Sequence, residues 1–122
     1  KNTFSLGKSV EKINFKTLQV KHGLVKYVVY IFEKTAYISD CNDLSIVKIK
    51  SLKNLNYLII DCLRIKKSYA HFNLEEALFV HRSLKPKKTI LINLSHDLDY
   101  QFLLKRLPNN VLPAYDGLIL NI

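Results

Sequence analysis

A short apolar run that turns abruptly polar is the feature that most constrains how this chain can fold. Thr89-Ile90-Leu91-Ile92 follows Pro86-Lys87-Lys88 and leads directly into Asn93 and the nearby His96. A run of this length, bounded in this way, is typical of a buried strand in an α/β sheet. In such folds the carboxyl ends of the strands carry the ligands and catalytic groups. We therefore expect a candidate site here, the alternative being a polar turn that only ends the strand.

Further strand-like and helix-like segments predict an α/β fold. Residues 56–61 form a second apolar run that ends at Asp61, and residues 74–84 carry apolar side chains at helical spacing. Asn73 is a good N-cap for that helix, with Glu76 in a capping-box position. We expect one domain, residues 1–122, in which at least two helices cover a sheet. The other expected elements are strands at 12–20, 26–32, 35–39, 89–93 and 118–122, with 26–32 and 35–39 forming a hairpin, and helices at 46–53 and 98–107.

The composition is that of a globular domain. The chain has 122 residues, of which 48% are hydrophobic, and this is enough for a core. No run approaches the roughly 18 apolar residues of a membrane span, and Lys1-Asn2-Thr3 lacks the apolar core of a signal peptide, so we expect a cytoplasmic protein without membrane contact. Cys41 and Cys62 lack Cys-x-x-Cys spacing, which favours reduced structural thiols over a disulfide or a zinc knuckle.

The net charge of +9 raises the question of nucleic-acid binding. The cations are dispersed along the chain, and the aromatic residues around Tyr30 and Tyr37 lie in strand-like runs, where packing in a sheet is their usual role. This pattern argues against a dedicated nucleic-acid surface. A basic nucleic-acid-binding domain remains a third interpretation, after the two given below.

Polar residues with metal-binding side chains follow several of the expected strands. His22 follows the first strand, Asp40 follows the hairpin, and His96 lies just beyond the late strand. Imidazole and carboxylate groups on rigid strand ends can converge on a metal ion, which lowers the pKa of a bound water in hydrolytic sites. Each residue also has an ordinary structural interpretation: a turn for His22, a turn or helix cap for Asp40, and a surface or capping position for His96. His81, in mid-helix, is interpreted as a solvent-facing or packing residue.

Several short segments occur in the order found in one known family. They are Lys21-His22-Gly23, Tyr37-Ile38-Ser39-Asp40, Asp61-Cys62-Leu63-Arg64, His71-Phe72-Asn73-Leu74-Glu75-Glu76-Ala77-Leu78, Leu94-Ser95-His96-Asp97-Leu98-Asp99-Tyr100 and Pro113-Ala114-Tyr115-Asp116-Gly117. In these segments the chain resembles the C-terminal half of a metallo-β-lactamase-fold hydrolase, of the branch that contains the phosphoribosyl cyclic phosphate phosphodiesterases. The match runs from about Phe15 to the end. It implies half of an αββα sandwich, with one mixed sheet and its covering helices.

The resemblance also implies roles for individual residues. His22 and Asp40 match metal ligands of the family, and Asp40 matches the carboxylate that bridges two metal ions. His71 matches a histidine that acts as a general acid toward the leaving alcohol, which suits a side chain able to release a proton near neutral pH. The alternative for His71 is a structural neighbour of the helix N-terminus. Asp61 and Arg64 match a family run in which an ion pair or a strand-end cap is the expected role.

Two departures from the family pattern concern the metal site. The main ligand motif of the family, His-x-His-x-Asp-His, is absent, and it belongs to the N-terminal half of the fold. At the late strand this chain has Asn93 where phosphodiesterase members carry a ligating His, and other relatives place a His where this chain has Ser95. His96 is then the candidate replacement ligand, since a neutral amide oxygen binds a divalent transition ion weakly.

Two functional interpretations follow from the resemblance. In the first, the chain is the C-terminal part of a metal-dependent phosphodiesterase that uses zinc or manganese, takes a small phosphodiester as substrate, and needs its missing N-terminal half as a partner. We expect this chain alone to be inactive as an enzyme and to bind few metal ions or none. In the second, the chain is a non-catalytic remnant that self-associates through the sheet face which the missing half would otherwise cover.

Overall fold

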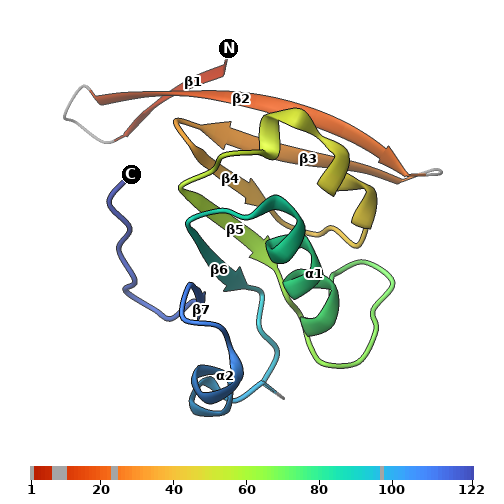
Figure 1. The fold of residues 1–122 in the computed structure, drawn as a ribbon. Helices are drawn as coiled ribbons and strands as arrows, with labels where there is room; N and C mark the ends of the chain where they lie inside the picture. The colour runs from red at the N-terminus through yellow and green to blue at the C-terminus, as the bar shows by residue number, and fades with distance from the viewer. Residues whose placement is uncertain (1, 7–10, 23–24, 97) are drawn as a thin grey trace.

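The strands lie side by side in one sheet in the order of the sequence, β1 to β7 (Figure 1). This computed structural model describes the backbone of residues 2–6, 11–22, 25–96 and 98–122, and the side chains of residues 14–20, 26–96 and 98–122. The strands are β1 (Asn2–Leu6), β2 (Glu11–His22), β3 (Val25–Phe32), β4 (Thr35–Ile38), β5 (Tyr57–Asp61), β6 (Lys88–Ile92) and β7 (Val111–Pro113). The helices are α1 (Leu74–Leu84) and α2 (Tyr100–Arg106), with 3-10 helices η1 (Leu44–Lys48) and η2 (Lys50–Leu52).

The sheet is mixed, as the resemblance implies. Neighbouring strands from β1 to β4 are antiparallel, whereas β4, β5, β6 and β7 are parallel to one another. Because β2 and β4 are both antiparallel to β3, β2 runs in the same direction as the parallel strands. The carboxyl ends of β2, β4, β5, β6 and β7 therefore share one edge of the sheet, which we call the carboxyl edge.

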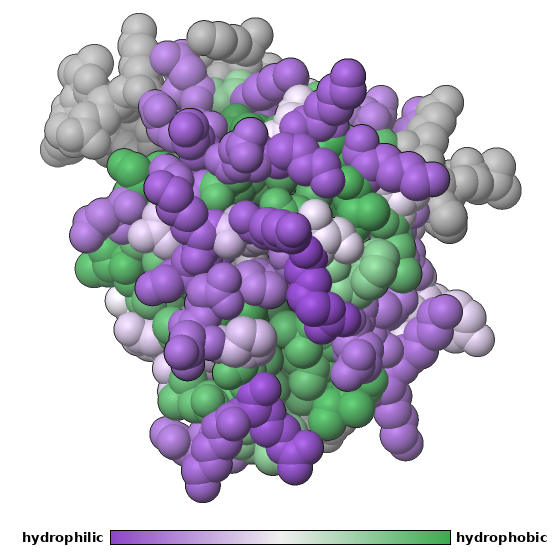
Figure 2. All heavy atoms as spheres, viewed as in Figure 1, coloured by the Kyte–Doolittle hydropathy of each residue, from purple (hydrophilic) through white to green (hydrophobic). Residues whose placement is uncertain are grey.

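The surface is mixed in character, and the described helices are short. Figure 2 shows hydrophilic residues spread over the viewed side of the molecule, with apolar residues between them. Among the described residues, no helix has both the length and the apolar character needed to cross a membrane.

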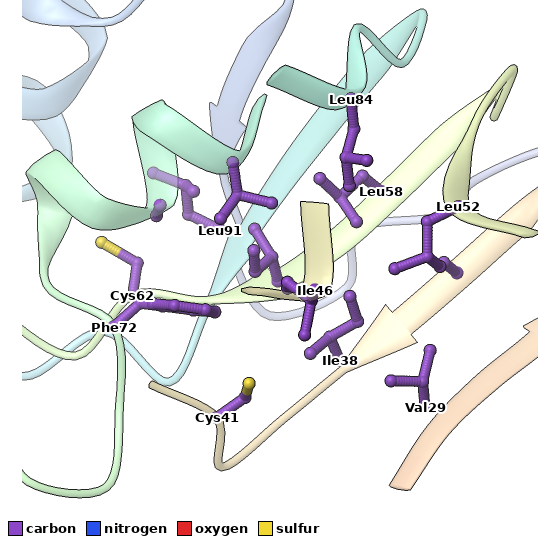
Figure 3. Packing of buried hydrophobic residues seen from close by; sticks show 14 of the residues in the cluster. Val29, Ile38, Cys41, Ile46, Leu52, Leu58, Cys62, Phe72, Leu84 and Leu91 are labelled. Carbon is purple, nitrogen blue, oxygen red and sulfur yellow. The ribbon is translucent and has the colours of Figure 1, made fainter. Parts of the chain in front are cut away.

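The core lies between one face of the sheet and α1 together with the 3-10 segments. Val29, Ile38, Ile60 and Leu91 are in register across four neighbouring strands, and all are buried. Since side chains alternate along a strand, these residues project from the same face. Figure 3 shows Val29, Ile38 and Leu91 packed with Ile46 and other buried residues from the covering elements, and Ile60 belongs to the same core cluster. Burial of this face holds α1 and η1 on the sheet.

Helix α1 has the bounds predicted from the sequence. The Asn73 side chain accepts a hydrogen bond from the Glu76 backbone N–H, and the Glu76 carboxylate accepts one from the Asn73 N–H, which completes the capping box. Lys85 ends the helix in a left-handed conformation. The apolar side faces the core through Ala77 and Val80.

The structure corrects two of the predicted elements. Residues 118–122 form no strand, and the strand that pairs with β6 is β7, at residues 111–113. Ile119 and Ile122 are 83% and 59% exposed, so this segment gains little from burial against the sheet. Residues 46–53 are not one helix but lie in η1 and η2, which are separated by the extended residue Ile49. β-branched residues such as Val47 and Ile49 favour α-helix weakly, and the short turns suffice to bury Ile46 and Leu52. Strand β1 was not predicted.

Candidate functional site

Asp61, the last residue of β5, is the centre of a polar cluster at the carboxyl edge. Its side chain is fully buried, and its Oδ2 accepts a hydrogen bond from the Cys41 backbone N–H at 3.0 Å. The same oxygen lies 2.6 Å from Nδ1 of His71, and Oδ1 accepts a hydrogen bond from the Asn93 amide at 2.5 Å. These partners come from three separate segments, so the carboxylate joins the ends of β4, β5 and β6. The hydrogen bonds compensate the cost of burying its charge.

The loop between β5 and α1 brings His71 back to Asp61. The Leu63 N–H donates to the Phe72 carbonyl at 2.9 Å, and the Leu74 N–H donates to the Arg64 carbonyl at 3.0 Å. These bonds close the loop at its base, and the wholly buried Phe72 anchors it in the core. His71 therefore lies beside the end of β5 although ten residues separate it from Asp61.

A second anchor holds the outer part of this loop. The Asn42 amide donates to the Tyr69 carbonyl, and its oxygen accepts a hydrogen bond of 2.7 Å from the Tyr27 hydroxyl. Burial raises the pKa of Tyr27, and the neighbouring Cys41 and Asp43 add smaller contributions in the same direction. The Tyr27 hydroxyl thus remains protonated and serves as a donor that fixes Asn42.

Asp40 and Asn93 occupy equivalent positions, just after β4 and β6. Both have left-handed backbones, with φ of 56° and 59°, which Asp and Asn tolerate better than most residues. The Asp40 side chain is 77% exposed, and its Oδ1 lies 3.6 Å from His71 Nδ1. Asn93 also donates to the Ser39 hydroxyl at 3.0 Å. The two turns direct one exposed carboxylate and one amide toward the cluster.

Among the described side chains, Asp40, Asp61 and His71 form a group whose ligand atoms all lie within 4.8 Å of one another. Carboxylate and imidazole are ligands for zinc and manganese. Two atoms that share a tetrahedral zinc ion are about 3.4 Å apart, from the usual bond lengths of about 2.1 Å. The 2.6 Å separation of Asp61 and His71 is shorter than this, so it is a direct hydrogen bond. Asp61 is therefore a hydrogen-bonding partner of His71, and the carboxylate of Asp40 is the member of the group that stays open to solvent.

The structure places His22 and His96 differently. His22 ends β2 at the carboxyl edge, with its backbone paired to Val25, and its side chain lies outside the described residues. His96 is exposed in the loop after β6. The residue before it, Ser95, donates its backbone N–H to the Leu63 carbonyl at 2.8 Å. It is not part of the group formed by Asp40, Asp61 and His71. The ligand roles of His22 and His96 remain predictions, and Gly23 and Asp97 of the same motifs lie outside the described residues.

The central position of Asp61 was not anticipated from the sequence, which suggested an ion pair with Arg64 or a strand-end cap. The Arg64 guanidinium instead donates to the Lys67 carbonyl at 3.1 Å, whereas Asp61 contacts His71. Asp61 does bond the backbone of Cys41 at the neighbouring strand end, so part of that expectation holds. The sequence feature that could have identified Asp61 is its position at the end of an apolar run, and the same feature identified Asn93.

The cysteines beside the cluster are structural. Cys41 and Cys62 are both buried and form no disulfide. Burial raises the pKa of each thiol to about 12, and the charge of Asp61 adds to the shift. A thiol that stays protonated is a poor metal ligand and nucleophile. This agrees with the role predicted for both residues.

Comparisons with known proteins identify the fold. No protein-family model matches the chain, and no curated protein matches it. Among solved structures, a diphosphatase from the PhnP family is 29% identical, with a TM-score of 0.79, over 98% of this chain and 46% of its own. The metallo-β-lactamase fold protein YhfI from Bacillus subtilis is 17% identical, with a TM-score of 0.66, over 96% of this chain and 51% of its own. The short form of human tRNase Z is 18% identical, with a TM-score of 0.61, over 99% of this chain and 47% of its own.

The share of each chain that is matched follows the same pattern in all three comparisons. Nearly all of this chain is matched, and it spans about half the length of each structure. The fold of this chain thus corresponds to part of a larger fold. The chain belongs to the metallo-β-lactamase fold and forms about half of it.

Proposed function

We propose that this chain is the C-terminal half of a metal-dependent hydrolase that acts on phosphodiesters. The observation that carries the proposal is the cluster of Asp40, Asp61 and His71 at the carboxyl edge of the sheet. The likeness over 98% of this chain to a protein described as a diphosphatase from the PhnP family supports it.

His71 and Asp61 form the proton-transfer part of this site. The 2.6 Å bond from Nδ1 to Asp61 fixes the orientation of the imidazole ring and leaves Nε2 to meet the substrate. From there His71 delivers a proton to the alcohol oxygen that leaves phosphorus. Asp61 touches no reacting atom, so it is a positioning residue: it holds the ring and stabilises the imidazolium before the transfer.

Asp40 is the metal ligand that this half contributes with its exposed carboxylate. A bound zinc or manganese ion would supply Lewis-acid stabilisation of the phosphate and an activated water. His22, at the end of β2, and His96 are the further ligands that we propose. The remaining ligands come from the other half of the fold, which the three matched structures contain beyond the part that this chain covers.

Metal binding by the purified chain tests the proposal. Addition of MnCl₂ or ZnCl₂ should raise the thermal unfolding midpoint by mass action, and D40N should remove most of that rise. D116N is the matched control, because Asp116 is another exposed carboxylate beyond the end of β7, and it should respond to metal as the wild type does. An equal metal response in D40N and the wild type would contradict the role of Asp40.

Catalysis provides a second test. The chain alone should hydrolyse bis(p-nitrophenyl) phosphate poorly, because its ligand set is incomplete. A substantial rate that persists after treatment with EDTA would be incompatible with the metal-dependent mechanism. A substantial rate that EDTA abolishes would show that the other half is dispensable.

A second candidate function is that of a non-catalytic interaction domain. The observation that favours it is Asn93, whose amide nitrogen donates to Asp61 and Ser39 and whose neutral amide oxygen binds a divalent transition ion only weakly. This function predicts no metal-dependent rise in the unfolding midpoint of the wild type. The thermal experiment above therefore separates the two candidates.

A further inference from the structure

The loop between β5 and α1 presents a fully exposed aromatic ring close to the candidate site. Tyr69 is 101% exposed, the largest value among the exposed large apolar and aromatic side chains of the described residues. Only Ala70 separates it from His71, so the Cα atoms of Tyr69 and His71 lie within about 7.6 Å of each other, two chain steps of about 3.8 Å. Figure 1 shows this loop extending away from the sheet edge between β5 and α1.

The backbone of Tyr69 is held in place although its ring is in solvent. Its carbonyl accepts a hydrogen bond from the Asn42 amide, and the Asn42 oxygen accepts one of 2.7 Å from the hydroxyl of the buried Tyr27. Asn42 lies two residues after Asp40, so these bonds tie Tyr69 to the strand end that carries the exposed carboxylate. An exposed side chain changes rotamer within picoseconds to nanoseconds. The ring can therefore turn onto a bound group while its attachment point stays fixed.

Other exposed aromatic rings of this chain already have ring partners. Tyr115, beyond the end of β7, is 51% exposed and packs edge-on against Tyr100 at 6.0 Å between ring centroids. The rings of Tyr30 and Tyr37 pack against each other at 6.5 Å. The ring of Tyr69 is instead open to water over its whole surface. Because burial of aromatic surface is favourable, a ligand ring that stacks on Tyr69 gains affinity from it.

His71 and Tyr69 offer two different chemistries to one ligand. The His71 side chain is 23% exposed, so its imidazole is partly open to solvent beside Asp40 and Asp61. Ala70, between His71 and Tyr69, is small and exposed, which leaves room for a ligand that contacts both neighbours. An alcohol with a planar ring fits this pair: its oxygen meets the proton donor, and its ring meets the aromatic side chain.

We propose that Tyr69 selects phosphodiesters whose leaving alcohol carries a planar aromatic ring, by stacking on that ring. The assignment rests on the proposed function, in which His71 protonates the oxygen of the same leaving alcohol. Asn42 is a positioning residue, because it acts only through the Tyr69 carbonyl. A nucleoside and a simple aryl alcohol both supply such a ring, and the ligands used below distinguish them.

Binding of three phosphodiesters of equal charge to the full chain tests the proposal. They are dimethyl phosphate, without a ring, bis(p-nitrophenyl) phosphate, with aryl rings, and adenylyl-(3′→5′)-adenosine, with bases. NMR titration with ZnCl₂ present, at about 200 mM salt to screen non-specific attraction, gives each affinity. A ring-bearing diester should bind the wild type about tenfold more tightly than dimethyl phosphate, as expected for stacking on an aromatic side chain. Y69A should remove this gain and Y69W should keep it. F79A is the matched control, since Phe79 is a 42% exposed aromatic residue on α1, and it should keep the gain.

The variant N42D tests the positioning role of Asn42. It keeps an oxygen that accepts the bond from Tyr27 but loses the amide that donates to Tyr69. The gain in affinity from the ring should fall at least threefold. This gain is a ratio between ligands of equal charge, so the new carboxylate affects both affinities alike and does not change the ratio. An undiminished ratio in N42D contradicts the positioning role.

Each alternative result has a distinct meaning. Equal affinity of the wild type for all three diesters overturns the proposal, and so does a gain that Y69A retains. A gain for adenylyl-(3′→5′)-adenosine alone supports it with a nucleoside as the leaving group, and a gain for the aryl diester supports it with an aryl alcohol. The imidazole signals of His71 separate the two proposals. If dimethyl phosphate shifts them but a ring adds no affinity, the hydrolase site stands and the role of Tyr69 fails. If Tyr69 binds a ring and no diester shifts them, the proposed hydrolase and the leaving-group assignment both fail.

Discussion

Asp40 and Asp61 have identical side chains, but their surroundings suit them to different roles. Both lie at the ends of parallel strands, but Asp61 is buried among donors, whereas the Asp40 side chain is 77% exposed. A carboxylate saturated with hydrogen bonds is suited to fixing a neighbour, here His71. A carboxylate open to solvent retains the lone pairs that a metal ion needs. The difference comes from their positions, since Asp61 is the last residue of β5 within the sheet, whereas Asp40 lies in the turn beyond β4.

His81 is the buried imidazole of α1, and its Nδ1 lies 2.6 Å from the Thr89 hydroxyl on β6. This contact confirms its interpretation as a packing residue. Burial lowers its pKa below the ordinary 6.5; a bond with Asn110 opposes this shift, and the nearby Arg82 adds to it. Stability from the neutral ring is then fully present above about pH 6.5 and is lost as the pH falls through the lower folded-state pKa.

Urea unfolding between pH 7.5 and pH 5 checks this expectation. The wild type should lose more stability on acidification than H81Q, whose side chain can bond Thr89 but does not titrate. The same pH dependence in H81Q and the wild type would contradict the assignment.

Helix α1 depends on its capping box, which satisfies backbone groups at both Asn73 and Glu76. N73A removes the cap and should lower the free energy of unfolding by about 1 kcal/mol. E76Q should cost much less, because glutamine can form the same reciprocal bond. Chemical denaturation measures both variants, and a larger loss in E76Q than in N73A would indicate that charge, not capping, stabilises this end.

Two substitutions test whether the last strand of the sheet lies at residues 111–113 or at residues 118–122. Val111 on β7 is 4% exposed, whereas Ile119, in the segment predicted as a strand, is 83% exposed. V111A should lower the free energy of unfolding by about 2 kcal/mol, from lost burial and a residual cavity. I119A should change it by less than about 0.5 kcal/mol. Comparable losses in both variants would place residues 118–122 back in the sheet.

The distribution of charge over the whole molecule predicts weak, non-specific binding to polynucleotides. Exposed cations occur on most segments, including Lys66-Lys67 and Lys87-Lys88, and hydrophilic residues are spread over the viewed side in Figure 2. Binding of labelled oligothymidylate, measured by anisotropy, should be weak at about 50 mM salt and disappear near 200 mM. The double variants K66Q/K67Q and K87Q/K88Q should reduce it equally. Complete loss in only one of them would reveal a dedicated site.

Local sequence predicted the elements whose stabilising contacts are also local. The bounds of α1 followed from its apolar spacing and the Asn73 cap, and β5 and β6 followed from their apolar runs. The cluster was only partly predictable: Asp40 and His71 were singled out, but the role of Asp61 was not. Its contacts span 10, 20 and 32 residues of sequence, and such distances contain no local signal.

The sequence by itself determined that this chain is α/β and that its strands end in carboxylate, amide and imidazole side chains. Hydrophobic periodicity and helix capping act within a few residues, so they can be read along the chain. Only the tertiary structure decided which of those side chains meet. Strand direction placed Asp40, Asp61 and Asn93 at one edge, and the closed loop returned His71 to it, because pairing and burial act between segments far apart in sequence. The same long-range packing decided that the final strand lies at residues 111–113.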